Sequence, residues 1–253
     1  MNKESYIGVF DSGVGGVSVL KELMALKPRE NYNYLGDSAN APYGAKTTEQ
    51  VKQRTLEVAE YLWSLGAKCL VVACNTATAA AIIALREKYP DRIIIGIEPA
   101  LKLAADRHPG GRIGVMATEV TLREEKFAAL TARCQESCTV IPLPSPGIVE
   151  LVEADTIESE AGYALLEKEL GPYVGKLDAV VLGCTHYPFA AKVIRDILGE
   201  NVDIVQGGPG TARETQRRLA EADLLNDGSG SLTVENTSGE KRLMELTMDL
   251  LNR

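Results

Sequence analysis

Two cysteines follow apolar runs of the same kind in the two halves of the chain. Cys74 ends the run in the stretch 66–76, GAKCLVVACNT, and Cys184 does so in the stretch 175–186, GKLDAVVLGCTH. Each stretch is typical of a polar turn, a short buried strand, and a cysteine followed by small polar residues where a helix would begin. Ligands of parallel α/β sheets bind outside the carboxyl ends of the strands. We therefore expect both thiols to face a substrate.

Two thiols on opposite sides of a cleft suit the removal of a carbon-bound proton from one face and the delivery of a proton to the other. A lone cysteine at the end of an apolar run is usually a small buried residue, but the duplication favours a functional role. Because a free thiol has a pKa of about 8.5, neighbouring groups must activate it. We expect this role for Asp11, at the end of another strand, and for His186, two residues after Cys184.

The elements that must position these groups also repeat along the chain. The segment 6–12, YIGVFDS, resembles the segment 112–119, RIGVMATE, and each precedes one of the two cysteine stretches. This repeat predicts an α/β protein with two similar parallel-sheet lobes, related by a pseudo-twofold axis and with the active site in the cleft between them. We expect residues 1–98 plus 207–253 to form the first lobe and residues 99–206 the second.

Hydrophobic periodicity places further elements around the repeat. It predicts strands over residues 6–10, 33–36, 92–97, 202–205 and 232–235, and helices over residues 17–26, 48–65 and 76–89. The turn 11–16, DSGVGG, lacks the last glycine of the dinucleotide fingerprint and the Gly-Lys-Ser/Thr of the other phosphate loop. It still offers exposed amides, an aspartate and a helix start, which suit a small anion. The loop 41–44, APYG, is either a turn or part of the site.

Composition and charge bound the class of protein. The 253 residues are 45% hydrophobic and 25% charged, as in ordinary globular proteins, with a net charge of −8. We expect no nucleic-acid or membrane partner, because both favour clustered Lys and Arg and no basic run is present. Five cysteines, an odd number, without an apolar signal region at the N-terminus predict a cytoplasmic protein with reduced thiols.

Five motifs, taken together, resemble those of the cofactor-independent aspartate/glutamate racemase family. They occur in the family's order and span nearly the whole chain: residues 11–16, DSGVGG; 42–44, PYG; 74–77, CNTA; 117–118, AT, with Thr121; and 183–188, GCTHYP. The resemblance implies a two-lobed homodimer that interconverts L- and D-glutamate and supplies D-glutamate for peptidoglycan. It implies no metal and no pyridoxal cofactor.

The resemblance also implies a role for each matching residue. Cys74 would act on D-glutamate and Cys184 on L-glutamate, each the acid to the other's base, while Asp11, Glu153 and His186 assist proton transfer. The residues that would hold the substrate through amides and hydroxyls are Ser12, Pro42, Tyr43, Gly44, Asn75, Thr76, Thr118, Thr121 and Thr185. The chain departs from the family at Glu150, where a proline is usual.

Three other readings of the sequence remain. An aspartate racemase would share the two thiols and accommodate a side chain shorter by one methylene, worth only about 1–3 kcal/mol of discrimination. A non-catalytic amino-acid sensor on the same scaffold would not need both thiols. A redox or zinc site is weakly supported, because Cys69 and Cys74 should point to opposite faces of one strand, and Cys134 and Cys138 lack further ligands.

Overall fold

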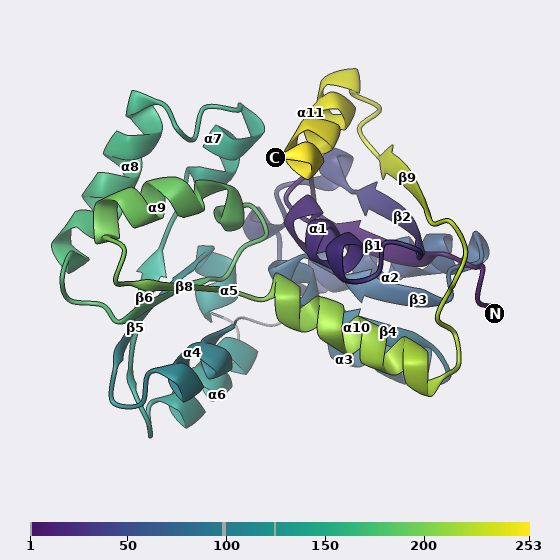
Figure 1. The fold of residues 1–253 in the computed structure, drawn as a ribbon, viewed down its shortest axis with the longest axis horizontal. Helices are drawn as coiled ribbons and strands as arrows, with labels where there is room; N and C mark the ends of the chain where they lie inside the picture. Colours follow the sequence, from purple (N-terminus) through teal and green to yellow (C-terminus); the bar gives the residue numbers. More distant parts are fainter. Residues whose placement is uncertain (1, 98–99, 124) are drawn as a thin grey trace. The chain divides into compact units, whose positions relative to one another are not determined.

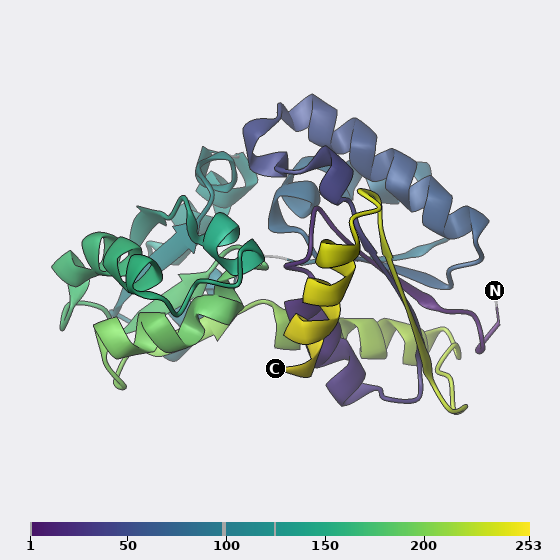
Figure 2. The ribbon, with the colours of Figure 1, turned by 90° about the horizontal axis from the view of Figure 1, so that it is seen from above.

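The computed structural model describes residues 2–97, 100–123 and 125–253, which fall into two compact units. The first lobe comprises Met1–Ile97 and Gly208–Arg253, and the second lobe comprises Glu98–Gly207. The expected boundary between residues 98 and 99 lies outside the described residues. Each lobe contains one parallel sheet flanked by helices (Figures 1 and 2), which confirms the predicted class of two parallel-sheet α/β lobes.

The sheet of the first lobe has the order β4-β3-β1-β2-β9, and all its strand pairs are parallel. Its strands are β1 (Ile7–Asp11), β2 (Asn31–Gly36), β3 (Cys69–Val72), β4 (Ile93–Gly96) and β9 (Ser231–Asn236). Every residue of β1 and β3 is buried. Strands covered on both faces read as continuous apolar runs, and this explains why the sequence alone predicts them well.

Helices cover both faces of the first sheet. They are α1 (Val17–Leu26), α2 (Thr48–Ser64), α3 (Asn75–Lys88), α10 (Gly208–Glu221) and α11 (Lys241–Asn252). Helix α1 packs against α10 and α11, whereas α2 packs against α3 on the opposite face (Figure 2). A capping box formed by Thr47 and Gln50 fixes the start of α2. The loop before α2 contains two short 3-10 turns, η1 (Ser38–Asn40) and η2 (Tyr43–Ala45).

The second lobe has a four-stranded parallel sheet of order β6-β5-β7-β8. The strands are β5 (Arg112–Ala117), β6 (Thr139–Pro144), β7 (Ala179–Leu182) and β8 (Asp203–Gln206). The helices are α4 (Leu101–Arg107), α5 (Glu119–Arg123), α6 (Glu125–Cys134), α7 (Ile148–Glu153), α8 (Glu160–Leu170) and α9 (Ala191–Leu198), with 3-10 turns η3 (Gly171–Tyr173) and η4 (Tyr187–Ala190). Helices α4 and α6 lie together on one face and α8 and α9 on the other (Figure 1).

The two sheets repeat one topology. If the strands of each lobe are numbered in chain order, both sheets have the spatial order fourth, third, first, second. This order is β4-β3-β1-β2 in the first lobe and β8-β7-β5-β6 in the second. The registers agree as well, since Ile7 is opposite Cys69 and Ile113 is opposite Ala179. Among the described residues, β9 has no counterpart in the second sheet. It extends the first sheet at the edge of β2.

The expected strands and helices form, with ends that differ by at most two residues. Sequence patterns did not indicate β6, because Pro142 and Pro144 interrupt its apolar alternation. Proline is tolerated in edge strands, and β6 is an edge strand. A second difference lies after Cys184, where an α-helix was expected. The 3-10 turn η4 comes first there, with Pro188 among its first residues, and the α-helix α9 begins only at Ala191.

Candidate active site

Cys74 occupies the junction between β3 and α3. It lies two residues beyond the strand and is the N-cap residue of the helix, where its Sγ accepts a hydrogen bond from the Ala77 amide at 3.4 Å. The thiol is also 3.5 Å from Ser12 Oγ, to which it donates, and only 5% of the residue is exposed. Backbone amides at a helix N-terminus favour negative charge, so this position suits a thiolate.

The turn that carries Ser12 is held tightly after β1. Asp11, fully buried at the end of that strand, accepts a hydrogen bond from the Gly13 amide at 3.0 Å. Tyr34 donates to the Gly13 carbonyl at 2.6 Å. A Cβ at Gly16 would overlap the Cβ of Asp11, so only glycine lets the chain pass this close. The turn therefore places Ser12 against the Cys74 thiol. The residue directly before Ser12, Asp11, supplies a buried carboxylate.

The loop after β2 brings Tyr43 to the same region. Tyr43 is buried in the hydrophobic cluster that contains Cys74, and its ring lies 6.1 Å from that of Phe10. Burial and the charge of Asp37 raise the pKa of Tyr43 well above its ordinary value, with a smaller contribution from Cys74, so the hydroxyl remains a hydrogen-bond donor. Of its expected neighbours in the site, Pro42 is exposed and Gly44 is half-buried.

Asn75 and Thr76 complete the candidate groups of the first lobe. They are the first two residues of α3 and both are buried. The same helix start therefore carries a thiol, an amide and a hydroxyl at the carboxyl end of β3. This arrangement offers hydrogen-bond donors and a positive dipole to a carboxylate substrate without any Lys or Arg.

The candidate site of the second lobe is a chain of three side chains. Cys184 Sγ lies 3.8 Å from His186 Nδ1, and His186 Nε2 lies 3.0 Å from a carboxylate oxygen of Glu153. His186 is 4% exposed, while the side chain of Glu153 is 27% exposed. A carboxylate accepts the hydrogen on Nε2, and this makes Nδ1 the nitrogen that can take a proton from the thiol.

Helix α7 positions Glu153, its last residue. Gly147 is the N-cap residue directly before this helix and has a left-handed φ of 86°, a conformation that favours glycine. Glu150, the residue at the position where the family usually has proline, lies in the first turn of α7, and its carbonyl accepts a hydrogen bond from the Ala154 amide at 2.9 Å. Glu150 therefore does not interrupt α7, and this helix places Glu153 against His186.

Three threonines were also predicted for this half of the site. Thr118 and Thr121 share a hydroxyl-hydroxyl hydrogen bond of 3.0 Å, and the Thr121 amide donates to Thr118 Oγ1 at 3.4 Å. Both follow β5, the strand next to β7. Thr185 is 5% exposed and directly follows Cys184. Their hydroxyls thus come from adjacent strand ends.

The two thiols occupy equivalent positions in the repeat. Each lies two residues beyond the strand that pairs with the first strand of its lobe. The residue before each cysteine makes the same backbone hydrogen bond, from Ala73 to the Phe10 carbonyl at 2.8 Å and from Gly183 to the Met116 carbonyl at 2.7 Å. The duplication seen in the sequence is therefore a duplication of geometry.

The other three cysteines have a different environment. All five are reduced thiols. Burial raises the pKa of Cys69 to about 12, and burial also raises the pKa values of Cys134 and Cys138. These thiols are suited to packing rather than to proton transfer. Within the described residues, no three His, Cys, Asp or Glu side chains gather where they could hold a metal ion.

Sequence reasoning missed the buried groups behind the site. Asp37 accepts hydrogen bonds from Tyr43 at 2.7 Å and from Arg54 at 2.8 Å. The fully buried Tyr187 donates to the Ser145 carbonyl at 2.7 Å, and burial together with the charge of Cys184 raises its pKa. A signal for Asp37 was present, because it directly follows β2 and the strand-end argument used for Cys74 applies to it.

Comparison with known proteins settles the family. The family model described as Asp/Glu/hydantoin racemase matches residues 11–215. The chain belongs to this racemase family. Among curated relatives in the family, glutamate racemase of Clostridium perfringens is 47% identical over 252 residues, which is 98% of this chain and 97% of the relative.

Solved racemase structures share the fold of this racemase. A glutamate racemase isoform from Bacillus anthracis superposes with a TM-score of 0.90 at 31% identity and covers 100% of this chain and 96% of its own. Escherichia coli glutamate racemase, solved with L-glutamate and an activator, has a TM-score of 0.88 at 31% identity, with 99% and 95% covered. The chain is thus an amino-acid racemase, an isomerase.

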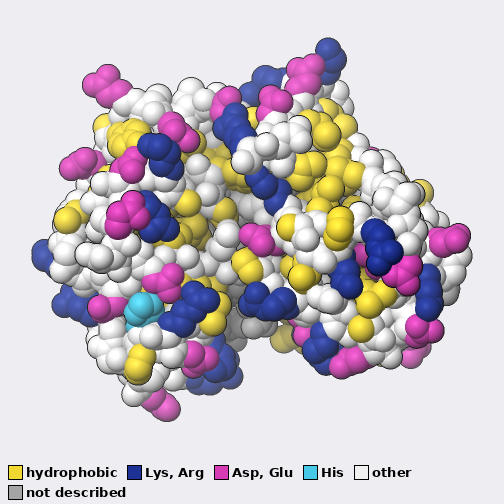
Figure 3. Space-filling view, viewed as in Figure 1, with side chains coloured by type: hydrophobic (Ala, Val, Ile, Leu, Met, Phe, Trp, Pro, Cys, Tyr) yellow, Lys and Arg dark blue, Asp and Glu magenta, His cyan; other side chains and the backbone are white. Residues whose placement is uncertain are grey.

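The surface and the helices add two further observations. On the face drawn in Figure 3, positive and negative side chains are interspersed over both lobes rather than gathered into patches of one sign. Of the helices in the described part of the chain, none is both long and apolar enough to cross a membrane.

Proposed function

We propose that this racemase interconverts L- and D-glutamate with two thiols as its acid and base. Cys184 takes the Cα proton of L-glutamate, and Cys74 delivers a proton to the opposite face of the same carbon. In the reverse direction the two cysteines exchange roles. The proposal requires both lobes to present their thiols to one substrate molecule.

The equivalent placement of Cys74 and Cys184 carries this proposal. A structural cysteine has no need to recur at the same strand end in both lobes with polar neighbours each time, whereas inversion at carbon needs one group on each face. The choice of glutamate is supported by the relatives, because the chain covers nearly all of a curated glutamate racemase at 47% identity. A related racemase has been solved with L-glutamate bound.

The neighbours of each thiol fit its proton-transfer role. At Cys184, the pair formed by His186 and Glu153 can accept the thiol proton and so prepare the base. At Cys74, the Ala77 amide and the start of α3 stabilise a thiolate, and Asp11 is the proposed proton-transfer partner in that lobe. After each turnover one cysteine has gained a proton and the other has lost one, so the thiols must exchange protons with solvent before the next cycle in the same direction.

The proposed substrate contacts use neutral groups. Carboxylates of glutamate would accept hydrogen bonds from amides and hydroxyls at the strand ends, including Ser12, Asn75, Thr76, Thr121 and Thr185. Such preorganised donors also stabilise the negative charge that develops when the Cα proton leaves. The thiols and these donors together supply acid, base and charge stabilisation, so we propose a reaction without metal or organic cofactor.

The cellular role is part of the same proposal. We propose a cytoplasmic homodimer whose D-glutamate product is used to build peptidoglycan. These assignments follow from the family resemblance. They are separate from the chemistry of the site and can be tested independently of it.

Racemisation in deuterated water tests the proposed reaction. With L-glutamate as substrate and no added cofactor, we expect the optical rotation to decay to zero while the D-product carries deuterium at Cα. Loss of activity after chelator treatment and its return with metal would contradict the cofactor-free mechanism. A higher kcat/KM for aspartate than for glutamate would assign the chain to aspartate. Binding of glutamate without label uptake would indicate a sensor.

A further inference from the structure

A buried carboxylate, Asp37, connects the candidate substrate loop to helix α2. Its Oδ2 accepts hydrogen bonds from the Tyr43 hydroxyl at 2.7 Å and from Arg54 Nε at 2.8 Å. Its Oδ1 accepts from Arg54 Nη2 at 2.8 Å and from Asn40 Nδ2 at 3.1 Å. The Asp37 side chain is fully buried, whereas that of Arg54 is 30% exposed. Arg54 therefore binds the carboxylate with both prongs of its guanidinium group.

The same carboxylate lies next to the candidate catalytic groups of the first lobe. The Asp37 amide donates to the Asp11 carbonyl at 2.9 Å, so the ends of β2 and β1 are joined. Tyr43, held by Asp37, packs its ring against Phe10 and shares a cluster with Cys74. The charges of both Asp37 and Cys74 contribute to the raised pKa of Tyr43. The network thus extends from an exposed helix surface to the region of the thiol.

We propose that Asp37 and Arg54 are positioning residues for the loop 37–44, which presents Tyr43 to the substrate. This inference rests on the proposed function, because the effect of the loop is measured through the racemisation of glutamate. An ionised Asp37 accepts a hydrogen bond from the Tyr43 hydroxyl and so fixes the orientation of the Tyr43 side chain and of the loop that carries it. Arg54 keeps Asp37 ionised inside the protein and balances a negative charge that would otherwise oppose a thiolate at Cys74.

The electrostatic balance at Asp37 shows why Arg54 is needed. Burial alone would raise the pKa of Asp37, but the hydrogen bonds from Arg54, Tyr43 and Asn40 outweigh it and lower that pKa. Without Arg54, the cost of burial favours the protonated acid. A protonated Asp37 would itself be a hydrogen-bond donor. Its O–H would compete with the Tyr43 hydroxyl for the hydrogen-bond position that fixes Tyr43. We therefore expect loss of Arg54 to displace the loop.

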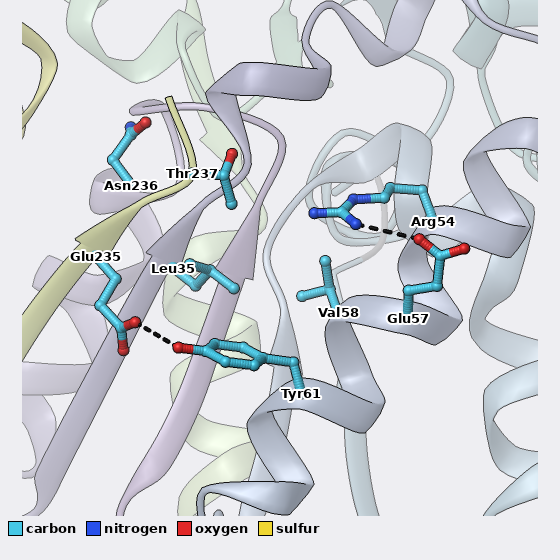
Figure 4. Close-up of a pocket in the computed structure, with 8 residues that line it drawn as sticks. All are labelled: Leu35, Arg54, Glu57, Val58, Tyr61, Glu235, Asn236 and Thr237. Atoms are coloured by element: carbon cyan, nitrogen blue, oxygen red, sulfur yellow. Dashed lines mark hydrogen bonds and ion pairs between the residues drawn. The ribbon is translucent and has the colours of Figure 1, made fainter. Parts of the chain in front are cut away.

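A cavity beside Arg54 makes this dependence directly testable. It has a volume of about 320 Å³, and its lining includes Leu35, Arg54, Glu57, Val58, Tyr61 and Glu235. Figure 4 shows Leu35 and Val58 between two polar pairs, Arg54 with Glu57 and Tyr61 with Glu235. Removal of the Arg54 side chain would join its volume to this cavity. A small planar cation from solvent could then reach Asp37.

The experiment compares Arg54→Ala with the parent protein in steady-state racemisation of both enantiomers. We expect the KM for each enantiomer to rise by at least about tenfold, because both use the same loop, while the ratio of the two kcat/KM values stays fixed by the equilibrium. Added guanidinium at millimolar concentration, far below denaturing levels, should restore kcat/KM with saturation. Neither urea nor tetramethylammonium should restore it, because urea carries no charge and tetramethylammonium has no hydrogen-bond donors.

Three variants separate positioning from stability. Glu57→Gln removes the other ion-pair partner of Arg54 and should leave the kinetics unchanged. Lys68→Met breaks a buried ion pair with Glu30 elsewhere in the same lobe, and should lower stability without raising KM. If Arg54→Ala does not accumulate as folded protein, Arg54→Lys carries the test, because it retains charge but loses the two-pronged contact. We expect its KM to lie between those of the parent and the alanine variant.

Several outcomes would overturn the proposal. If folded Arg54→Ala has the same KM as the parent protein, the pair of Asp37 and Arg54 has only a structural role. The same conclusion follows if guanidinium has no more effect than urea, or if Lys68→Met raises KM as much as Arg54→Ala does. Failure of the proposed function is distinguishable, because the parent protein would then not racemise glutamate at all.

Discussion

At the scale of single residues, the two thiols occupy equivalent positions but have different neighbours. Cys74 contacts a backbone amide and the Ser12 hydroxyl, whereas Cys184 lies beside an imidazole that is itself paired with Glu153. In the proposed mechanism, the base in the second lobe thus depends on a titratable group, and the base in the first lobe depends more on a helix start. This difference predicts that variants will affect the two reaction directions unequally.

His186→Asn tests that asymmetry. The variant removes the proposed acceptor of the Cys184 proton, so the turnover number with L-glutamate should fall by more than that with D-glutamate. The ratio of the two kcat/KM values must remain unchanged, since no enzyme variant alters the equilibrium, and the asymmetry can appear only in kcat and KM separately. Equal losses of kcat in both directions would argue against a role confined to Cys184.

Asp37→Asn tests the charge state of the buried carboxylate through stability. The pKa of Asp37 in the folded protein is below its ordinary value, so its ionisation stabilises the fold above the unfolded-state pKa of about 3.9 and this contribution is lost as the pH falls through the lower folded-state pKa. Urea unfolding should therefore show a parent-minus-variant difference that is largest near neutral pH and shrinks in acid. A difference that grows with acidity would contradict this assignment.

At the scale of elements, the strand ends could be predicted from the sequence and the links between them could not. Cys74, Asp11 and Cys184 follow apolar runs, and the runs alone place them at the carboxyl ends of parallel strands. The bond between Asp37 and Arg54 spans 17 residues and depends on the way α2 packs over the loop. The pairing of Glu153 with His186 likewise depends on where α7 ends. No local pattern encodes such contacts.

A buried ion pair holds the C-terminal segment on the first lobe. Lys68, fully buried before β3, donates to the Leu224 carbonyl at 2.9 Å and to Glu30 at 2.5 Å, and the other oxygen of Glu30 accepts from the Asn226 amide at 2.8 Å. These contacts join the loop before β2, the start of β3 and the chain that leads to β9. The edge strand therefore depends on a charged contact as well as on its pairing with β2.

Lys68→Met should be strongly destabilising, because it leaves the Glu30 carboxylate buried without its cation. We expect a loss of about 3–5 kcal/mol in the free energy of unfolding, measured by urea denaturation. The exposed pair of Lys102 and Asp106 supplies the control, and Lys102→Met should cost less than about 1 kcal/mol. Similar losses in the two variants would show that burial of the Lys68 pair does not govern its contribution.

At the scale of the whole molecule, the account depends on one thiol in each of two repeated lobes. The sequence indicated the repeat because both cysteine stretches and both first strands are similar in type and spacing. It did not indicate β6, because its prolines conceal the second strand of the second lobe. Four strands of each sheet share one order, and in both lobes a cysteine follows the equivalent buried strand.

The most direct test of the central claim is the initial rate of glutamate racemisation by Cys74→Ala and by Cys184→Ala. Inversion needs a base on one face of Cα and an acid on the other, and a methyl group is neither. Each variant, shown to be folded by circular dichroism, should therefore have no measurable racemisation in either direction while still binding glutamate. If either variant retains a rate within about tenfold of the parent, a change of only about 1.4 kcal/mol in the barrier, the two-thiol mechanism is wrong.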